Sequence, residues 1–552
     1  MKIVIVGAVA AGATCATALR RKSEEYEIVM FEKDRDMSFS NCQIPYYLSD
    51  TFDDSKDLVG NDEESFKRKY NIDSKSCHEV VSIDRENKRV KVKDISGDKY
   101  FYESYDKLVL APGASSIVPD IKGVDNDFVF TLRNVEDIEK IKKYATENKI
   151  KTATVVGGGF IGIETAENLK DVECKINIID NGDELLSNID SELKGIIHEN
   201  IKAHGHNVLT GKKVTEIGDK VVIIDDKEKI QTDLVILAIG MKPNIKLAED
   251  CGLEISENKT IKVDKNFLTS DKDIYAAGDA IDVYNLVSRK KTKLALAWPA
   301  HRQAKAIASH IHGEDIKNEA VIGSFILRSF DINVASTGLN EKTLEELGLD
   351  YKTSITTSID KGGLMPDRKK MSIKLLFDKY TGVLYGAQAV GEGEVDKRID
   401  VCATIIKLKG TIYDLDAAEL CYNPLFSTPE DAINTAANQA INILDNKLRQ
   451  VRLKDIMKEH DKYLIFDLRD EKSFNKSHIK NAHHLDYKEL RESIDDISKD
   501  KKVLFYDYTG ALSSNAIKTL NNFGYSNTYM LEGSYELLDK YMKLKNFNIY
   551  SC

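Results

Sequence analysis

Two segments of the chain show the same order of apolar strand, glycine turn and helix. The apolar run KIVIV (2–6) precedes the turn GAVAAG, a helical stretch through Arg21 and a second apolar run, EIVMFEK. The same order returns near residue 153, where ATVVGGGFIGIETAENL leads into CKINIIDNG. This pattern is typical of a βαβ unit that binds a nucleotide. The sequence therefore predicts two nucleotide sites in one chain.

Further apolar segments predict additional domains. Each βαβ unit is followed by a strand that ends in a glycine turn, YDKLVLAPGA (105–114) and TDLVILAIGMKPN (232–244). Alternating segments such as MSIKLLFD and TGVLYGAQAVG predict an α+β module within 321–440. The last hundred residues, from YLIFDLRD, predict a separate small α/β domain.

Composition narrows the function classes. The chain has 552 residues, 42% of them hydrophobic, and a net charge of −11, which argues against a nucleic-acid partner. Its eight cysteines form no CxxC pair, so we expect no metal site and a reducing compartment. No apolar run reaches the roughly 18 residues of a membrane helix. We expect a cytoplasmic protein without a membrane partner.

The first glycine turn carries the residues that hold a dinucleotide. Gly7 fits the tight turn and Gly12 allows the helix to approach the strand, while Val9 occupies the position of the middle glycine. Glu32 stands 20 residues beyond Gly12 at a strand end, where a carboxylate can accept ribose hydroxyls.

The second turn keeps all three glycines, Gly157, Gly159 and Gly162, and Asp180 ends its second strand. No lysine or arginine follows Asp180 until Lys194. A 2′-phosphate would meet a carboxylate and no cation there, so NADH is expected to be preferred over NADPH.

Together with AAGDA (276–280), these motifs resemble the two-dinucleotide flavoprotein disulfide reductases over about residues 1–440. The resemblance implies FAD at the first unit and a nicotinamide at the second, with Asp279 near the ribityl chain and pyrophosphate and Phe160 as an aromatic gate over the flavin. It also implies cofactor contacts at Asn41, Ala111 and Gly240.

A single cysteine distinguishes the subgroup. In SFSNCQIPYYL, Cys42 has no partner cysteine in a CxxC or CxxxxC spacing, so one sulfur must act alone. The context resembles the single-cysteine enzymes: coenzyme A-disulfide reductases, NADH oxidases, NADH peroxidases and persulfide reductases. We expect Cys42 to open a helix whose dipole favours the thiolate.

Other positions favour a thiol substrate. The oxidases and peroxidases of this subgroup carry a histidine where this chain has Ala10. The segments 393–401 and 419–427 resemble the dimerisation domain of coenzyme A-disulfide reductases, which implies a homodimer with Tyr422 reaching the partner's cysteine site. Arg20, Ser38 and Asn41 are the predicted substrate contacts. The basic run Arg20, Arg21 and Lys22 could hold coenzyme A phosphates, and the alternative is a solvated helix end.

Two departures leave specificity open: Leu364 lies where the family has a tyrosine pair, and His301 lies where it has an asparagine. The role of His301 is not defined by the sequence.

The tail resembles a rhodanese domain that has lost its nucleophile. Its loop D-Y-T-G-A-L-S places Asp507 at the cysteine and Leu512 at the arginine of the C-x-x-G-x-R-S pattern. A carboxylate cannot carry sulfane sulfur, so we expect no sulfurtransferase activity. The domain can instead serve as an inert cap, as an element of the dimer or as a docking surface for a protein.

We therefore expect an α/β enzyme with two Rossmann-like domains, an α+β dimerisation domain and a rhodanese-like domain. The predicted ranges are 1–115 and 245–320 for the FAD domain, 116–244 for the NAD domain, 321–445 for dimerisation and 451–552 for the tail.

The expected function is NADH-dependent reduction of coenzyme A disulfide, or of coenzyme A persulfide and polysulfide, through a Cys42 mixed disulfide. Two alternatives remain: an NADH oxidase or peroxidase that uses a Cys42 sulfenic acid, and a slow-turnover redox sensor that binds FAD, NADH and coenzyme A.

Overall fold

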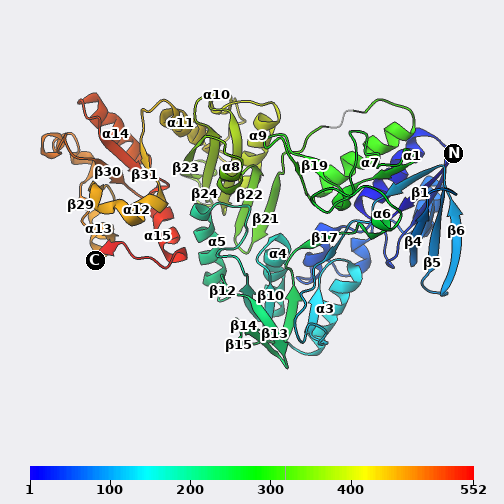
Figure 1. Cartoon of the computed structure of the whole chain (residues 1–552). Coiled ribbons are helices and arrows are strands. Elements are labelled where there is room, and N and C mark those ends of the chain that lie inside the picture. The colour runs from blue at the N-terminus through cyan, green and yellow to red at the C-terminus, as the bar shows by residue number, and fades with distance from the viewer. Residues whose placement is uncertain (317–318, 552) are drawn as a thin grey trace. The chain divides into compact units, whose positions relative to one another are not determined.

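The computed structural model describes residues 1–316 and 319–551 and divides into two compact units (Figure 1). Unit 1 contains Met1–Asp183 and Leu209–Val321; unit 2 contains Glu184–Val208 and the chain from Ile322 onward. Residues 317–318 and 552, which fall inside the predicted ranges 245–320 and 451–552, lie outside the described residues.

The first sheet of unit 1 is parallel and confirms the first predicted βαβ unit. Its strand order is β18 (Ile274–Ala276), β7 (Lys107–Leu110), β1 (Lys2–Val6), β2 (Glu27–Phe31) and β3 (Asp73–Lys75). Ile3, Val4 and Ile5 of β1 are completely buried, as expected for a central parallel strand covered on both faces. Helices α1 (Ala10–Lys22) and α7 (Ala297–Ile311) pack against each other beside this sheet.

The second sheet confirms the second βαβ unit. Its strand order is β12 (Asn207–Leu209), β11 (Lys175–Ile179), β10 (Thr152–Val156), β16 (Leu234–Leu237) and β9 (Val129–Thr131). Helix α4 (Phe160–Leu169) follows β10 directly, and α3 (Val135–Glu147) packs against β9. The two parallel sheets give unit 1 its two nucleotide-binding folds.

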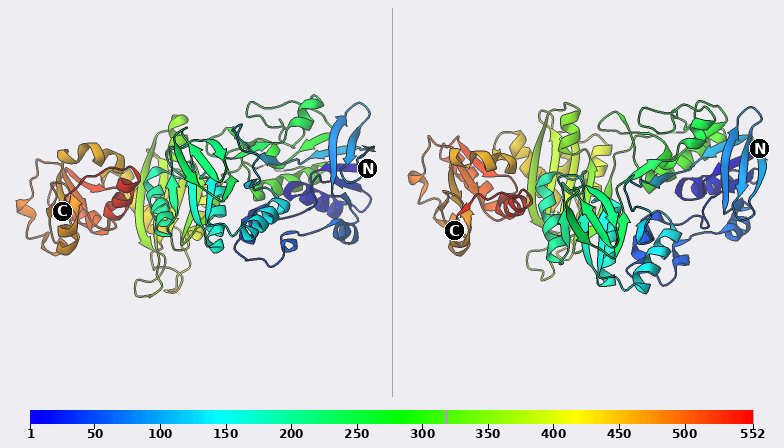
Figure 2. Two further views of the ribbon diagram at one scale, coloured as in Figure 1. Left: turned by 90° about the horizontal axis from the view of Figure 1, so that it is seen from below. Right: turned by 60° about the horizontal axis from the view of Figure 1, so that its bottom comes forward.

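Smaller antiparallel sheets complete unit 1. Strands β4 (His78–Asp84), β5 (Arg89–Asp94) and β6 (Lys99–Ser104) form a three-stranded sheet beside β1, drawn in blue near the N-terminus (Figure 2). Strands β13 (Val214–Gly218), β14 (Val221–Ile224) and β15 (Glu228–Gln231) form another.

Unit 2 contains the predicted α+β module. Its antiparallel sheet runs β21 (Phe325–Ser329), β22 (Ile332–Gly338), β25 (Leu384–Gly391), β24 (Lys370–Asp378) and β23 (Tyr351–Ile359). Helix α9 (Val395–Lys407) packs on β22 and β25, and α11 (Ala432–Leu444) packs on β23 and β24. The short helices α8 (Glu341–Glu346) and α10 (Ile412–Asp416) lie between these elements in the chain.

The tail forms a parallel five-stranded sheet in unit 2. Its order is β26 (Gln450–Val451), β31 (Thr528–Leu531), β30 (Val503–Tyr506), β27 (Leu464–Asp467) and β29 (His483–His484). Its helices are α12 (Leu453–Glu459), α13 (Glu471–Lys476), α14 (Ala511–Asn522) and α15 (Ser534–Leu544). Helix α15 packs along α5 (Ser191–Ala203), as Figure 1 shows. Among the described helices, none has the length and apolar character to cross a membrane.

Candidate active site

The glycines of the first turn cannot be replaced without moving backbone. Gly7 has φ +94°, and a Cβ there would lie 2.2 Å from the Ala111 carbonyl oxygen. A Cβ on Gly12 would lie 1.7 Å from the Gly7 carbonyl oxygen. The turn therefore brings the N-terminus of α1 close to the ends of β1 and β7, the geometry that a pyrophosphate requires.

Glu32 reaches back to this turn from the end of β2. Its carboxylate accepts hydrogen bonds from the amides of Ala8 (2.8 Å) and Asp34 (3.1 Å). Burial raises the pKa of this carboxyl. Ser38 joins the same loop, because its amide donates to the Ala8 carbonyl at 2.8 Å.

The second turn repeats this geometry and leaves one side open. A Cβ on Gly157 would lie 2.3 Å from the Ala238 carbonyl oxygen, and a Cβ on Gly162 would lie 1.9 Å from that of Gly157. Around Gly159, by contrast, no atom lies within 4 Å of the Cβ position. This open space above the first turn of α4 fits a pyrophosphate, and a side chain would fill it.

Asp180 stands at the end of β11 beside this turn. Its carboxylate accepts hydrogen bonds from the amides of Gly158 at 2.5 Å and Gly182 at 2.7 Å. The side chain is therefore held at the mouth of the glycine turn, where the ribose of a dinucleotide lies in this fold. Phe160 begins α4, and Gly240, at φ +120°, follows β16 and accepts the Ile117 amide at 3.0 Å.

Cys42 lies near the start of a short 3₁₀ helix, η1 (Asn41–Tyr47). Among the described cysteines of unit 1, only Cys42 is exposed. Although the residue is exposed, the protein atoms around the thiol partly desolvate it and raise its pKa; the carboxylates of Glu164 and Asp279 act in the same direction, while Arg133 opposes them. The structure places Cys42 at the start of a helix as expected, and the stabilisation of its thiolate by the helix dipole stays a prediction, which burial and the two carboxylates oppose.

Asn41 supplies an unused polar atom next to Cys42. Its side-chain oxygen is buried and has no hydrogen-bond partner in the protein. A buried carbonyl oxygen without a donor is costly and indicates that a donor arrives from a bound molecule or water. The position therefore fits the predicted contact to cofactor or substrate.

Asp279 lies in the short helix η4 (Gly278–Ala280) and is held by residues that the sequence motifs did not indicate. Burial raises the pKa of its carboxyl, and the Arg133 guanidinium, 3.5 Å away, opposes this shift. Gln303 of α7 accepts the Gly278 amide at 2.8 Å and fixes the same turn. Both partners come from distant parts of the chain, so no local pattern could identify them.

Glu164 is a second residue without a sequence signal. It lies on α4, which packs against η1, and its charge acts on Cys42. Burial, with a smaller contribution from Glu167, raises the pKa of Glu164 to about 7. A carboxyl that changes charge near neutral pH beside a nucleophilic sulfur is typical of an active site.

His301 joins α7 to α1 through a 2.6 Å hydrogen bond between its Nδ1 and the Thr14 hydroxyl. Burial lowers the pKa of His301, which favours the neutral imidazole. The structure thus gives His301 a definite partner on the helix that follows the first glycine turn.

Arg20 requires a correction. It is 5% exposed, and its guanidinium donates to the backbone carbonyls of Tyr70, Ser23, Tyr26 and Asn71 at 2.8–3.0 Å. These bonds tie α1 to the neighbouring loops and occupy the donors that a phosphate would need. The neighbouring Arg21 is exposed and keeps its charge at the surface.

Tyr422 lies in unit 2, in the loop between α10 and α11, and is 51% exposed. This loop contacts the loop that carries Leu364, because the Gly362 amide donates to the Pro424 carbonyl at 2.9 Å. Leu364 itself is 97% exposed. The two positions that resemblance singled out in this domain therefore share one exposed surface.

In the tail, Asp507 fills the centre of its own loop. The carboxylate is buried and accepts hydrogen bonds from the amides of Gly510 (2.7 Å) and Leu512 (3.0 Å). The hydroxyls of Ser513 and Ser534 contact it at 2.7 and 3.1 Å. Two amides that could face a bound anion in this loop thus already bind a carboxylate of the protein itself.

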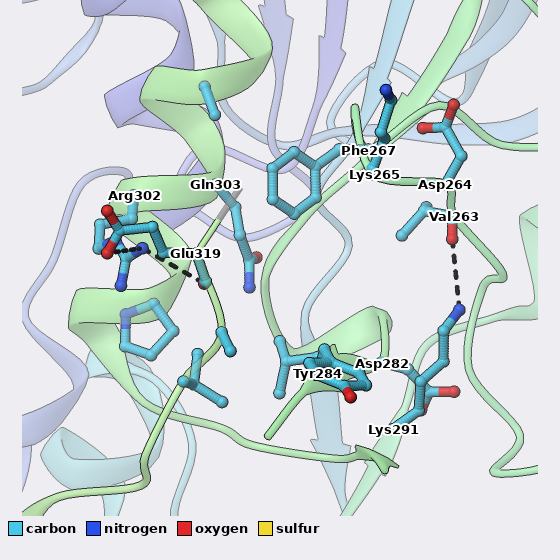
Figure 3. Close-up of a pocket in the computed structure, with 15 residues that line it drawn as sticks. Val263, Asp264, Lys265, Phe267, Asp282, Tyr284, Lys291, Arg302, Gln303 and Glu319 are labelled. Carbon is cyan, nitrogen blue, oxygen red and sulfur yellow. Dashed lines mark hydrogen bonds and ion pairs between the residues drawn. The ribbon is translucent and has the colours of Figure 1, made fainter. Parts of the chain in front are cut away.

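A cavity of about 380 Å³ lies beside α7 in unit 1, away from the glycine turns (Figure 3). Arg302 and Gln303 of α7 face it together with Phe267 and Tyr284. None of the predicted site residues lines it. Gln303, which lines this cavity, also accepts the hydrogen bond from the Gly278 amide, next to Asp279.

Profiles of known families match three parts of the chain. The profile described as pyridine nucleotide-disulphide oxidoreductase matches residues 1–304, the dimerisation domain of the same family matches 327–433, and the rhodanese-like domain matches 450–540. The chain belongs to the pyridine nucleotide-disulphide oxidoreductase family.

Similar proteins narrow this class. The coenzyme A disulfide reductase of Staphylococcus haemolyticus is 33% identical over 80% of this chain and 99% of that protein. The crystal structure of reduced Bacillus anthracis CoADR-RHD has a TM-score of 0.95 at 36% identity and covers 98% of both chains. A NAD-dependent persulfide reductase from A. fulgidus has a TM-score of 0.92 at 34% identity, covering 97% of this chain and 100% of the other.

These similarities confirm the predicted subgroup. The chain is a flavin-dependent oxidoreductase like the coenzyme A disulfide and persulfide reductases, fused to a rhodanese-like domain.

Proposed function

We propose that the protein uses NADH to reduce coenzyme A disulfide, or coenzyme A persulfide and polysulfide, through a mixed disulfide at Cys42. The observation that carries this proposal is the exposed Cys42 at the start of η1, with no second described cysteine beside it that could form a disulfide. The similar proteins named above act on the same class of sulfur compounds according to their names. We further propose a cytoplasmic homodimer.

The chemistry at Cys42 follows from thiol–disulfide exchange. The Cys42 thiolate attacks one sulfur of coenzyme A disulfide, the S–S bond breaks, and one coenzyme A thiolate leaves with a mixed Cys42–coenzyme A disulfide remaining. The departing thiolate needs a proton, for which Tyr422 of a partner subunit is the proposed donor. Because the thiol pKa is raised, the attack requires a base or a neighbouring positive charge to form the thiolate.

The family uses FAD, and the residues present fit it. Gly7 and Gly12 leave the approach to α1 free of side chains, Glu32 lies beside that turn, and Asp279 lies in η4. When bound, FAD supplies the two-electron transfer between the nicotinamide and sulfur. Ser38 and Asn41 are the proposed contacts for coenzyme A, and the exposed Arg21 takes the place of Arg20 as a phosphate ligand.

The test is anaerobic NADH consumption by the purified yellow protein with coenzyme A disulfide, coenzyme A persulfide or inorganic polysulfide as acceptor. Turnover with one of these acceptors supports the proposal, and relative kcat/KM values identify the substrate. Turnover that appears only when oxygen is admitted would contradict it and favour an oxidase with a Cys42 sulfenic acid.

Asp180 is proposed to set the preference for NADH. Replacing Asp180 with alanine removes the carboxylate that would accept the ribose hydroxyls and repel a 2′-phosphate. We expect the ratio of kcat/KM for NADPH to that for NADH to rise by about tenfold or more, the effect of about 1.4 kcal/mol. Asp183→Ala, in the following turn, is the matched control and should leave the ratio unchanged.

The tail is proposed to be inactive in sulfur transfer, because Asp507 occupies the loop. Removing this carboxylate in Asp507→Ala leaves the Gly510 and Leu512 amides without an acceptor. We expect the tail to lose about 1–3 kcal/mol of stability, measured as accelerated amide exchange in β30 and α14. Asp500→Ala, at an exposed position of the same domain, should leave exchange unchanged. Thiosulfate sulfurtransferase activity of the unmodified full chain would refute the inactivity.

A further inference from the structure

The structure buries a cluster of charged side chains in unit 2, where the tail meets α5 and the dimerisation domain. Lys374 of β24 is completely buried. Its ammonium lies 3.1 Å from Asp190 and 2.8 Å from Glu192, which belong to the start of α5, and 2.5 Å from Glu341 of α8. Three carboxylates therefore surround one cation without access to water.

The tail completes this cluster with two residues of its own. Arg452, which precedes α12, contacts Glu341 and lies 3.3 Å from Glu192 and 3.8 Å from Glu532. Glu532, at the end of β31, is 0% exposed. It accepts hydrogen bonds from the Leu453 amide at 3.2 Å and from the Thr353 hydroxyl of β23 at 3.1 Å.

Helix packing holds the tail at the same place. Helix α15 crosses α5 at Gly195, where a Cβ would lie only 2.6 Å from the Lys540 carbonyl oxygen. Next to this crossing, Glu184 contacts Lys545 of the tail and lies 3.1 Å from Lys194. The tail is thus in close contact with both the dimerisation domain and α5.

The charges of the cluster do not balance. Its cations are Lys374 and Arg452, and its carboxylates are Asp190, Glu192, Glu341 and Glu532. With all of them ionised, the buried cluster would carry two uncompensated negative charges. Burying unpaired charge costs several kcal/mol per ion, and a carboxyl in that situation takes up a proton instead.

We propose that the rhodanese-like tail is docked on the dimerisation domain and α5 as a proton-dependent lock, in which Glu532 holds a proton while the tail is docked and loss of that proton releases the tail. Glu532 is the carboxylate of the cluster that comes from the tail, and it follows β31 of the tail's sheet. Facing it are Glu192, Arg452, Lys374 and Glu341, with the Tyr541 hydroxyl of α15 in the same electrostatic environment.

The direction of the pH dependence follows from the protonation states. Burial, followed by the charge of Glu192, raises the pKa of Glu532 to about 7, whereas Lys374 and Arg452 hold that of Glu341 at about 2. A carboxyl whose pKa is raised by docking binds its proton more tightly in the docked state. Docking therefore weakens as pH rises from the ordinary pKa of a glutamate carboxyl to the raised pKa of about 7. Docking is also lost in strong acid, when Glu341 is protonated.

The test is amide hydrogen exchange of the full chain, corrected for the intrinsic pH dependence of exchange. We expect protection of α5, against which α15 of the tail packs, to fall roughly tenfold between about pH 6 and about pH 8.5. Protection of β30, inside the tail, should stay constant, which distinguishes undocking from unfolding of the tail. The variant Glu532→Gln cannot lose a proton and should show no pH dependence.

Glu471→Gln, at an exposed position of α13, is the matched control and should behave as the unmodified chain. Equal protection at both pH values in the unmodified chain, or an unchanged pH dependence in Glu532→Gln, would overturn the proposal. Where Glu532→Gln does not fold, Asp190→Asn removes the other excess carboxylate and should reduce the pH dependence of protection. If protection in Asp190→Asn depends on pH as strongly as in the unmodified chain, the proposal is likewise overturned.

Discussion

Cys42→Ser is expected to abolish turnover with coenzyme A disulfide or persulfide, with a fall in kcat of more than about 10³-fold. A serine hydroxyl cannot form the mixed disulfide, and no other described cysteine of unit 1 is exposed to replace it. Anaerobic steady-state assays measure this loss. Bleaching of the flavin by NADH should persist, because the glycine turns that hold both nucleotides are unchanged.

Cys77→Ser is the control for this experiment. Cys77 is half-buried in the loop before β4, so its replacement should leave both turnover and flavin reduction unchanged. Turnover of Cys42→Ser at a substantial fraction of the original rate would mean that the sulfur chemistry takes place elsewhere in the chain.

The two nucleotide folds could be predicted from the sequence because their signals are local. The strand KIVIV and the glycines that follow it lie within a dozen residues, and a Cβ on Gly12 would meet the Gly7 carbonyl within the same turn. The strands β1, β2, β10 and β11 were predicted at nearly the positions observed. A buried parallel strand is uniformly apolar, which makes it recognisable without knowledge of its neighbours.

The electrostatics of the site could not be predicted in the same way. The thiol pKa of Cys42 depends on burial and on Glu164 and Asp279, which lie more than a hundred residues further along the chain. Arg20 was proposed as a phosphate ligand because it belongs to a basic run, but its environment includes Tyr70 and Asn71, about 50 residues away. Charge in a sequence indicates neither the direction of a side chain nor its partners.

One loop of the tail contains both a feature that the sequence predicts and one that it does not. The sequence predicted that Asp507 removes the nucleophile, since this follows from the residue type alone. It did not predict that the carboxylate accepts the Gly510 and Leu512 amides, because that requires the conformation of the loop. The aspartate that removes the nucleophile thus also supplies a hydrogen-bond acceptor for two amides of the loop.

Lys374→Met is expected to produce the largest loss of stability in unit 2, about 3–5 kcal/mol. Methionine fills similar volume but leaves Asp190, Glu192 and Glu341 without the ammonium that lies within 3.1 Å of each. Denaturant unfolding of the full chain, followed by circular dichroism and by exchange in β24, measures the change. Lys370→Met, on the same strand, removes an exposed ion pair with Glu536 and should cost no more than about 1 kcal/mol.

The pH dependence of this loss provides a second check. Without Lys374, the remaining carboxylates have raised pKa values in the folded state and take up protons as pH falls. Their protonation relieves the repulsion, so the deficit of Lys374→Met relative to the unmodified chain should be smaller near pH 5 than near pH 8. A deficit that is equal at both values would mean that the loss comes from packing around the side chain rather than from its charge.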